Sequence, residues 1–282
     1  MREEVRIDTD SDGPSFIAIN KPVWAYGLEE VTGILPLKGA RARRIAFAQL
    51  ATPGAAHREA DNLGLLARGL PLWLAETMYF SKNYTAVALI GSREGKRLAP
   101  IDLPWSQQAV HQLAKAAQEA PDFVVPGSLT RIGEGHGLSL DVWDLPKSRH
   151  RRQFSAQWTP GTADTALVTL QEHFRLFMEW TPNDETDGLA YKSPGRPSLW
   201  IETLDASLSL SLAEKAGFDR DAFALPSSVF DLAAEQAFSG EAASLAWLTL
   251  QDRSIRLGKL AAPVPVQVYG TARVKAAQLE LA

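Results

Sequence analysis

The sequence predicts an α/β protein with a mixed sheet, in the order β-α-β-α-β-β-β-α, followed by a small all-α helical domain. Three observations lead to this prediction. Short apolar runs alternate with amphipathic runs from residue 43, three strand-like runs then follow one another up to residue 158, and helical patterns dominate after residue 198. The 282 residues, 45% hydrophobic and 22% charged, have the balance of a soluble globular protein.

Composition excludes several classes of site. There is no cysteine, which removes disulfides, thiolate nucleophiles and thiolate metal ligands. A formal net charge of -4 gives no compositional reason to expect nucleic acid. No apolar run approaches the roughly 18 residues of a membrane span, and the start MREEVRIDTDSDGP lacks the apolar core of a signal peptide. We therefore expect a cytoplasmic protein, or a periplasmic one if a leader was removed from this chain.

The first part of the chain divides at residue 43. Residues 1–42 are expected to form an amino-terminal arm or edge strands, with short apolar pieces FIAI at 16–19 and ILPL at 34–37. Whether they pair with the sheet is left open. The run IAFAQL at 45–50 then predicts the first regular strand.

A helix is predicted next. Its apolar stripe consists of Leu63, Leu66, Leu70, Leu74 and Met78, at helical spacing. Proline lacks the N–H that a helix interior needs, and it suits the first turn. The proline at position 71 therefore predicts a helix that begins near Leu70, with a break at the preceding glycine.

The remaining elements up to residue 180 follow from their periodicity. Leu138, Leu140 and Val142 point one way along a strand while the residues between them are more polar, which is typical of an antiparallel sheet with one wetter face. The predicted elements are a strand at TAVALIG (85–91), a helix at LPWSQQAVHQLAKAAQEA (103–120), strands at FVVPGSLTRI (123–132), GLSLDVWDL (137–145) and RRQFSAQW (151–158), and a helix at GTADTALVTLQEHFRLFMEW (161–180).

Residues 181–197, TPNDETDGLAYKSPGRP, are polar and rich in proline and glycine, so they are the predicted linker between domains. The 198–282 segment is predicted to be a helical domain of about four helices. Its first element is ambiguous, because leucines at 208, 210 and 212 alternate with serines as in a strand. The four-residue spacing of Trp200, Leu204, Leu208 and Leu212 favours a helix. Later helices are expected from Ser228, from residue 242 and after Pro265.

One acidic stretch resembles half of a calcium loop. In DTDSDG at 8–13, Asp8, Asp10 and Asp12 alternate before a sixth-position glycine, the arrangement that brings carboxylates around a hard cation. The twelfth position, which should supply a bidentate glutamate, is Ile19. A solvated acidic terminus is the alternative, and whether these aspartates bind calcium is left open.

Two further patterns concern anions. GSREGK at 91–96 has three residues between its glycines where a phosphate loop has four, so a surface turn is the better interpretation. Basic runs KGARARR at 38–44 and KSRHRR at 147–152 would suit a phosphate backbone if the fold placed them side by side. Otherwise each is a solvated turn that leads into a strand.

The glycine-rich GEGHG at 133–137 lies between two strand-like runs. A dinucleotide loop needs a helix after its glycines, whereas a strand follows here, so the sequence predicts a hairpin turn with His136 exposed at its tip. The histidines show no metal spacing, and the sequence contains no complete catalytic, cofactor or metal motif.

The segment DFVVPGSLTRIGEGHGLSLDVWDL at 122–145 resembles the TolB amino-terminal domain family: an apolar strand, a glycine-serine step, a hairpin, and alternating leucines that end in Trp-Asp. LARGLPLWLAETM at 66–78 resembles the helix entry of that family, and IAFAQL takes the place of its first strand. The resemblance covers residues 43–180. The family's Leu-Pro-Phe ending of the first strand is absent here, and the similar ILPL lies earlier.

The resemblance implies a mixed sheet with helices on one side, used for contacts with other proteins. We therefore expect a non-catalytic interaction or scaffold protein without a cofactor, whose partner is another protein. Whether it forms an oligomer is left open. The alternatives are a nucleic-acid-binding module that uses runs 38–44 and 147–152, and an enzyme whose site is assembled from distant residues.

Overall fold

The computed structural model describes residues 4–5, 15–54, 62–93, 97–116, 119–184, 188–215, 217–218 and 228–281. It confirms the predicted fold class. The elements are β1 (Glu4–Val5), β2 (Ser15–Ile19), β3 (Arg43–Ala48), α1 (Leu63–Tyr79), β4 (Tyr84–Arg93), β5 (Arg97–Leu98), α2 (Gln107–Ala116), β6 (Phe123–Val125), β7 (Gly127–Ile132), β8 (Gly135–Asp144), β9 (Arg149–Trp158), α3 (Ala163–Phe177), α4 (Pro197–Ala213), α5 (Ser228–Gln236), α6 (Glu241–Arg256) and α7 (Ala272–Glu280).

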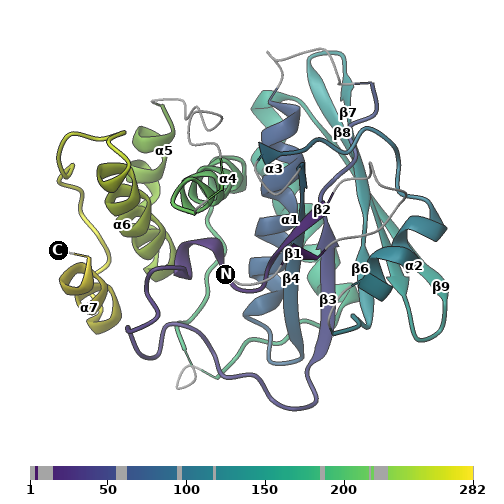
Figure 1. The fold of residues 1–282 in the computed structure, drawn as a ribbon, viewed down its shortest axis with the longest axis horizontal. Helices are drawn as coiled ribbons and strands as arrows, with labels where there is room; N and C mark the ends of the chain where they lie inside the picture. The colour runs from purple at the N-terminus through teal and green to yellow at the C-terminus, as the bar shows by residue number, and fades with distance from the viewer. Residues whose placement is uncertain are drawn as a thin grey trace.

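The described strands form one mixed sheet of nine strands. Strand β3 pairs in parallel with β4 on one side and β6 on the other, and the remaining pairs are antiparallel. Strands β6 and β7 both pair with the same side of β8, and β9 pairs with its other side. Strand β9 therefore forms one edge of the sheet, as Figure 1 shows.

Helices cover both faces of the sheet. Because side chains alternate along a strand, Ile45 and Phe47 of β3 enter the large core with α1 and α3, whereas Ala46 and Ala48 face the small core with α2. The helices that follow the sheet lie beyond α1, with α4 nearest to it and α6 and α7 farther out (Figure 1). The large core is continuous from the sheet through α1 into α4.

Helix α1 runs without a break through Pro71, so the predicted break at Gly69 and the start near Leu70 are wrong. A proline in a helix interior leaves the carbonyl four residues earlier without its usual donor. Here the Ala67 carbonyl accepts a hydrogen bond from the Leu50 N–H at 3.0 Å. The cost of the proline is thus reduced by a contact with the chain that leaves β3.

The glycine at 69 has a different role, which is close packing of α1 against α4. A Cβ atom on Gly69 would lie 2.6 Å from the backbone oxygen of Ile201. Beside this contact, Arg68 donates to both carboxylate oxygens of Asp205, at 2.7 and 2.8 Å. Helix α4 is buried nearly all round, which explains why its leucine-serine pattern has no clear amphipathic period.

The GEGHG segment is a two-residue hairpin, because Ile132 of β7 pairs with Gly135 of β8. Gly133 has φ +58°, as the first central position of a type II′ turn requires. The predicted exposure of His136 is wrong. The side chain lies within β8, is 7% exposed, and packs on Trp158 with ring centroids 5.7 Å apart.

The amino-terminal arm packs closely against the helices. The FIAI piece is β2, paired with β4, whereas ILPL is not a strand. Lys38 donates to the carbonyl oxygens of Tyr79 and, at 3.0 Å, Ser81, so a cation lies at the carboxyl end of α1. Its burial lowers the pKa of Lys38 to about 8.

Three boundaries differ from the predictions. The last helix begins at Ala272, with Thr271 as its N-cap, and not soon after Pro265. The run FVVPGSLTRI is divided at Pro126 into β6 and β7. Helix α2 begins at Gln107, three residues after the expected Pro104. Within the described chain, no helix has the length and apolarity of a membrane span.

Candidate functional site

Neither DTDSDG nor GSREGK lies wholly within the described residues. The aspartates of DTDSDG lie outside the described residues. Among the residues that are described, no cluster of three or more histidine, aspartate or glutamate side chains is arranged to hold a metal. Residues 91–93 of GSREGK end β4, residues 94–96 lie outside the described residues, and the next described element is the strand β5, which pairs antiparallel with β4.

The two basic runs meet at one end of the sheet. Strands β3, β4 and β6 are parallel and so begin at the same end, with Arg43, Tyr84 and Phe123 as their first residues. Strand β9 also begins there. The guanidinium carbons of Arg43 and Arg151 lie 5.5 and 5.9 Å from the centroid of the Phe123 ring. The fold thus brings the two basic runs together, which the sequence left open.

A β-bulge orients the arginines of the second run. Val142 pairs with Arg152, but the next residue of β8, Trp143, pairs with His150, so Arg151 is the extra residue. A bulge interrupts the alternation of side chains along a strand. Arg151 and Arg152 consequently both reach the Phe177 ring of α3, at 5.2 and 5.6 Å from its centroid, while His150 turns to the opposite face.

We call Arg43, Arg151 and Arg152 the arginine cluster. Each of the three also contacts a second ring: Arg43 lies 4.7 Å from the Tyr84 centroid and Arg152 lies 5.2 Å from that of Phe154. Cation–π contacts of this kind restrict the guanidinium groups and leave N–H donors available. Arg151 and Arg152 are exposed and Arg43 is half-buried.

Acidic side chains lie close to several of the other basic residues of the two runs. Arg44 pairs with Glu119, and Lys147 and Arg149 lie 3.8 and 3.9 Å from the buried Asp144. His150 lies 2.9 Å from Asp141. Among the described residues, no carboxylate forms an ion pair with a member of the arginine cluster. These arginines therefore keep unused hydrogen-bonding capacity at the surface.

Next to the cluster, β9 presents an open edge. The strand has ten residues and pairs only with β8 among the described strands. No described backbone group outside the sheet donates to or accepts from its outer side. Residues 149–153 are exposed, whereas Phe154 and Trp158 enter the core under α3. Unpaired N–H and C=O groups thus run beside ordered arginines.

The opposite face of the same strands is hollowed. An open groove of about 320 Å³ is lined mainly by small and polar side chains of β7, β8 and β9, including Ser128, Thr130, Ser139, Ser155 and Gln157. Helix α2 packs farther along this face, over β2, β3, β4 and β6. The groove therefore adjoins the β9 edge on the side away from the arginines.

A second polar centre lies in the core, and the sequence reasoning missed it. Glu76 of α1 is 2% exposed and accepts hydrogen bonds from the indole N–H groups of Trp24 and Trp200, at 2.8 and 3.0 Å. Burial raises the pKa of Glu76 to about 7, although these indoles and the nearby Tyr191 hydroxyl oppose the rise. A single acid inside the apolar run LWLAETMYF was the available signal.

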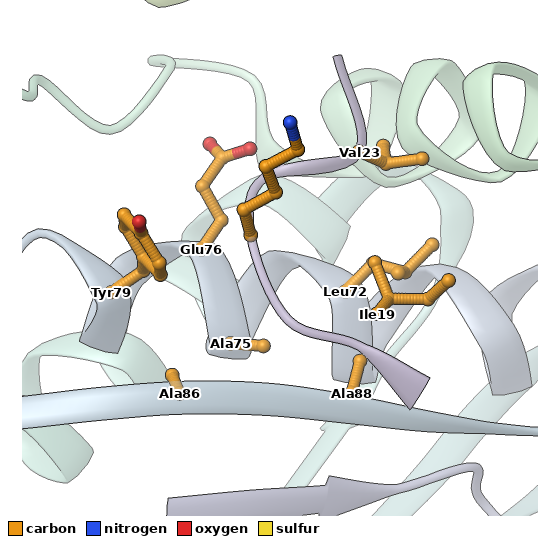
Figure 2. Close-up of a pocket in the computed structure, with 9 residues that line it drawn as sticks. Ile19, Val23, Leu72, Ala75, Glu76, Tyr79, Ala86 and Ala88 are labelled. Carbon is orange, nitrogen blue, oxygen red and sulfur yellow. The ribbon is translucent and has the colours of Figure 1, made fainter. Parts of the chain in front are cut away.

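The surroundings of Glu76 indicate a structural role. Figure 2 shows Glu76 and Tyr79 projecting from α1 on the side away from the strand that carries Ala86 and Ala88. The adjacent cavity measures about 10 Å³, which is room for about one water molecule. Such a space does not admit a substrate. The carboxyl instead connects the amino-terminal arm, α1 and α4 through its two indole partners.

Comparisons with known proteins give limited similarity. The sequence matches no family model and no curated protein. Among solved structures, the chain is similar to TolB from Acinetobacter baumannii, with 13% identity and a TM-score of 0.30 over 54% of this chain. That match spans 31% of the TolB chain, less than a third of its length.

The chain is also similar to a PelC dodecamer structure from Paraburkholderia phytofirmans, with 13% identity and a TM-score of 0.23. The match covers 49% of this chain and 87% of the PelC chain. Scores this low carry no inference about function, which is therefore argued from the surfaces described above.

Proposed function

We propose that this chain is a non-catalytic module that binds another protein through the arginine cluster and the adjoining edge of β9. The observation that carries the proposal is the bulge at Arg151, which turns two arginines to one face beside the unpaired outer edge of β9. Arginine side chains that pack on aromatic rings are partly ordered before binding. Less side-chain entropy is therefore lost when a partner immobilises them. Arginine is also enriched at the energetic centres of protein interfaces.

The domain organisation and the family are part of this proposal. We propose a TolB amino-terminal-like domain at 43–180, a linker at 181–197 and a helical domain of about four helices at 198–282. Because the large core continues from the sheet into α4, the two domains would share a buried interface. Limited proteolysis checks the division: the proposed linker should be cleaved before the rest of the chain, and a first cleavage elsewhere contradicts it.

The test of the proposed function is capture followed by reconstitution. The tagged chain is used to isolate proteins from its native cell, and each candidate is purified and titrated against the chain by calorimetry. We expect a partner whose affinity falls at least tenfold with the double variant Arg151→Glu and Arg152→Glu. The control, Lys259→Glu with Lys275→Glu, makes the same charge change on exposed positions of the helical region. Equal loss in both variants, or no partner, refutes the proposal.

Nucleic acid is the second candidate, because the fold brings runs 38–44 and 147–152 together at Phe123. Against it, acidic side chains pair with much of the second run, and arginines already occupy faces of the rings on which bases would stack. A nucleic-acid site predicts binding of an oligonucleotide that weakens steeply as salt rises. Flat binding curves at low salt exclude it.

A further inference from the structure

The edge of β9 has the properties of a strand-addition site. Along a β-strand, the residues turn their N–H and C=O groups alternately to the two sides, and β8 uses one side of β9. Within the described chain, the other side has no backbone partner. An extended peptide that lies beside an open edge obtains affinity from main-chain hydrogen bonds and specificity from alternate side chains.

The α3 face and the opposite face of the sheet differ at this edge, so they favour different side chains in such a peptide. On the α3 face, a strand next to β9 brings its side chains near Arg152 and Arg151 only beside the start of β9, where Arg152 lies over Phe154 and Arg151 reaches inward to Phe123 of β6. On the other face, the intervening side chains lie over the groove lined by Ser155 and Gln157. Beside the start of β9, the matching sequence therefore alternates acidic residues with small or polar ones.

A second copy of the chain fits the arginine end of this edge poorly. Pairing of two β9 strands centred on residues 151 and 152 would bring the arginines of the two copies close together, and like charges that face each other across a strand pair are destabilising. Charged side chains on edge strands commonly block such self-pairing. A nucleic acid has no peptide backbone with which to pair the strand. The positive charge of the arginines and the unpaired backbone of β9 together favour an acidic polypeptide as the partner.

We propose that β9 accepts an extended acidic segment of another protein as an additional strand, with its carboxylates paired to Arg151 and Arg152. This proposal rests on the proposed function and specifies the chemistry of its partner. The added strand would extend the sheet beyond its present edge, on the side away from β8 (Figure 1). The buried Glu76 centre and the helical region take no part.

The test uses a fluorescent ten-residue peptide that alternates glutamate with threonine, titrated against the full chain by anisotropy. Three control probes accompany it: the same peptide N-methylated at alternate backbone nitrogens in each of the two phases, and a lysine-threonine peptide of the same length. Amide hydrogen exchange of residues 149–158 is measured with and without the acidic peptide.

We expect the acidic peptide to bind and to slow exchange in β9. One of the two N-methylated peptides, and the double variant Arg151→Glu with Arg152→Glu, should each lose at least tenfold in affinity. Equal binding by all acidic peptides, or binding without protection of β9, overturns strand addition. Absence of binding at millimolar peptide also overturns it. The Lys259→Glu and Lys275→Glu variant should bind normally.

Two further arms separate the possible failures. An oligothymidylate that binds more tightly than the peptide at the same salt, and that protects the same residues, overturns the proposal in favour of nucleic acid. A partner from the native cell that binds the chain while β9 stays unprotected overturns strand addition but leaves the proposed function standing. Failure of every protein partner refutes the proposed function itself.

Discussion

Replacing Glu76 with glutamine tests whether a buried carboxyl controls the stability of this fold. The side chain is 2% exposed and holds Trp24 and Trp200 through their indole N–H groups. Its pKa is raised from 4.5 to about 7, chiefly because burial disfavours the charged form. Glutamine has nearly the same shape and cannot ionise, so the substitution removes the titration and keeps the packing.

The direction in which stability changes with pH follows from the pKa of Glu76 in the unfolded and folded states. Below pH 4.5 the carboxyl is protonated in both states, and its contribution to stability is fully present. Between pH 4.5 and about 7 the unfolded chain releases the proton while the folded protein keeps it, so stability falls as pH rises. A rise from 4.5 to about 7 corresponds to a loss of roughly 3 kcal/mol, complete above pH 8.

The glutamine variant carries its own cost. An amide supplies one acceptor oxygen, so one indole N–H would face the NH₂ group, at a cost of about 1–3 kcal/mol. The variant should therefore be less stable than the wild type at pH 5, and the difference should shrink by roughly 3 kcal/mol, or reverse, by pH 8.

The assay is urea unfolding of both proteins at half-unit pH steps from 4 to 9, followed by tryptophan fluorescence. Glu172→Gln, on an exposed position of α3, is the matched control and should run parallel to the wild type. A wild-type stability that does not fall between pH 5 and 8 relative to Glu76→Gln would falsify the reasoning. Parallel curves for the two proteins would mean that this carboxyl titrates normally.

Three further predictions concern backbone contacts and helix packing. Gly69→Ala should destabilise by about 1–3 kcal/mol in denaturant unfolding, because its Cβ would lie 2.6 Å from the α4 backbone. Gly64→Ala, in the same helix with its nearest neighbour at 3.4 Å, should instead be neutral or stabilising by about 0.5–1 kcal/mol, and the opposite order contradicts the contact. A double-mutant cycle of Arg68→Ala and Asp205→Ala should give a coupling of roughly 1–3 kcal/mol, and zero coupling would show the bidentate pair to be inert. Gly133→Ala should cost about 1–2 kcal/mol, from the positive φ of +58° alone, and an unchanged midpoint would disprove the turn assignment.

Local sequence patterns correctly predicted the features that depend on local interactions, such as the buried face of a strand. The alternation of Leu138, Leu140 and Val142 fixed which face of β8 is buried, and four-residue spacing correctly identified α4 as a helix. The stripe through Leu70 and Leu74 was also right, but Gly-Leu-Pro was interpreted as a break. That glycine is explained by a helix that follows more than a hundred residues later, a contact that no local pattern contains.

The candidate sites depend on distant residues in the same way. The partners of Glu76 lie 52 residues before it and 124 residues after it, so the sequence offered only an isolated acid in an apolar run. The two basic runs were predicted to form a surface only if the fold placed them side by side, and the sequence did not show that it does. The bulge that turns Arg151 has no sequence signature, because it is set by pairing with β8.

The hydrogen bond from Leu50 to the Ala67 carbonyl has a consequence for how the protein opens. Proline usually weakens a helix locally, but here the carbonyl it frees ties the segment after β3 to the middle of α1. Fraying of the helix at this turn must also release that segment. The amide of Leu50 should therefore exchange with solvent only in openings that involve β3 and α1 together, so the two elements unfold as one cooperative unit.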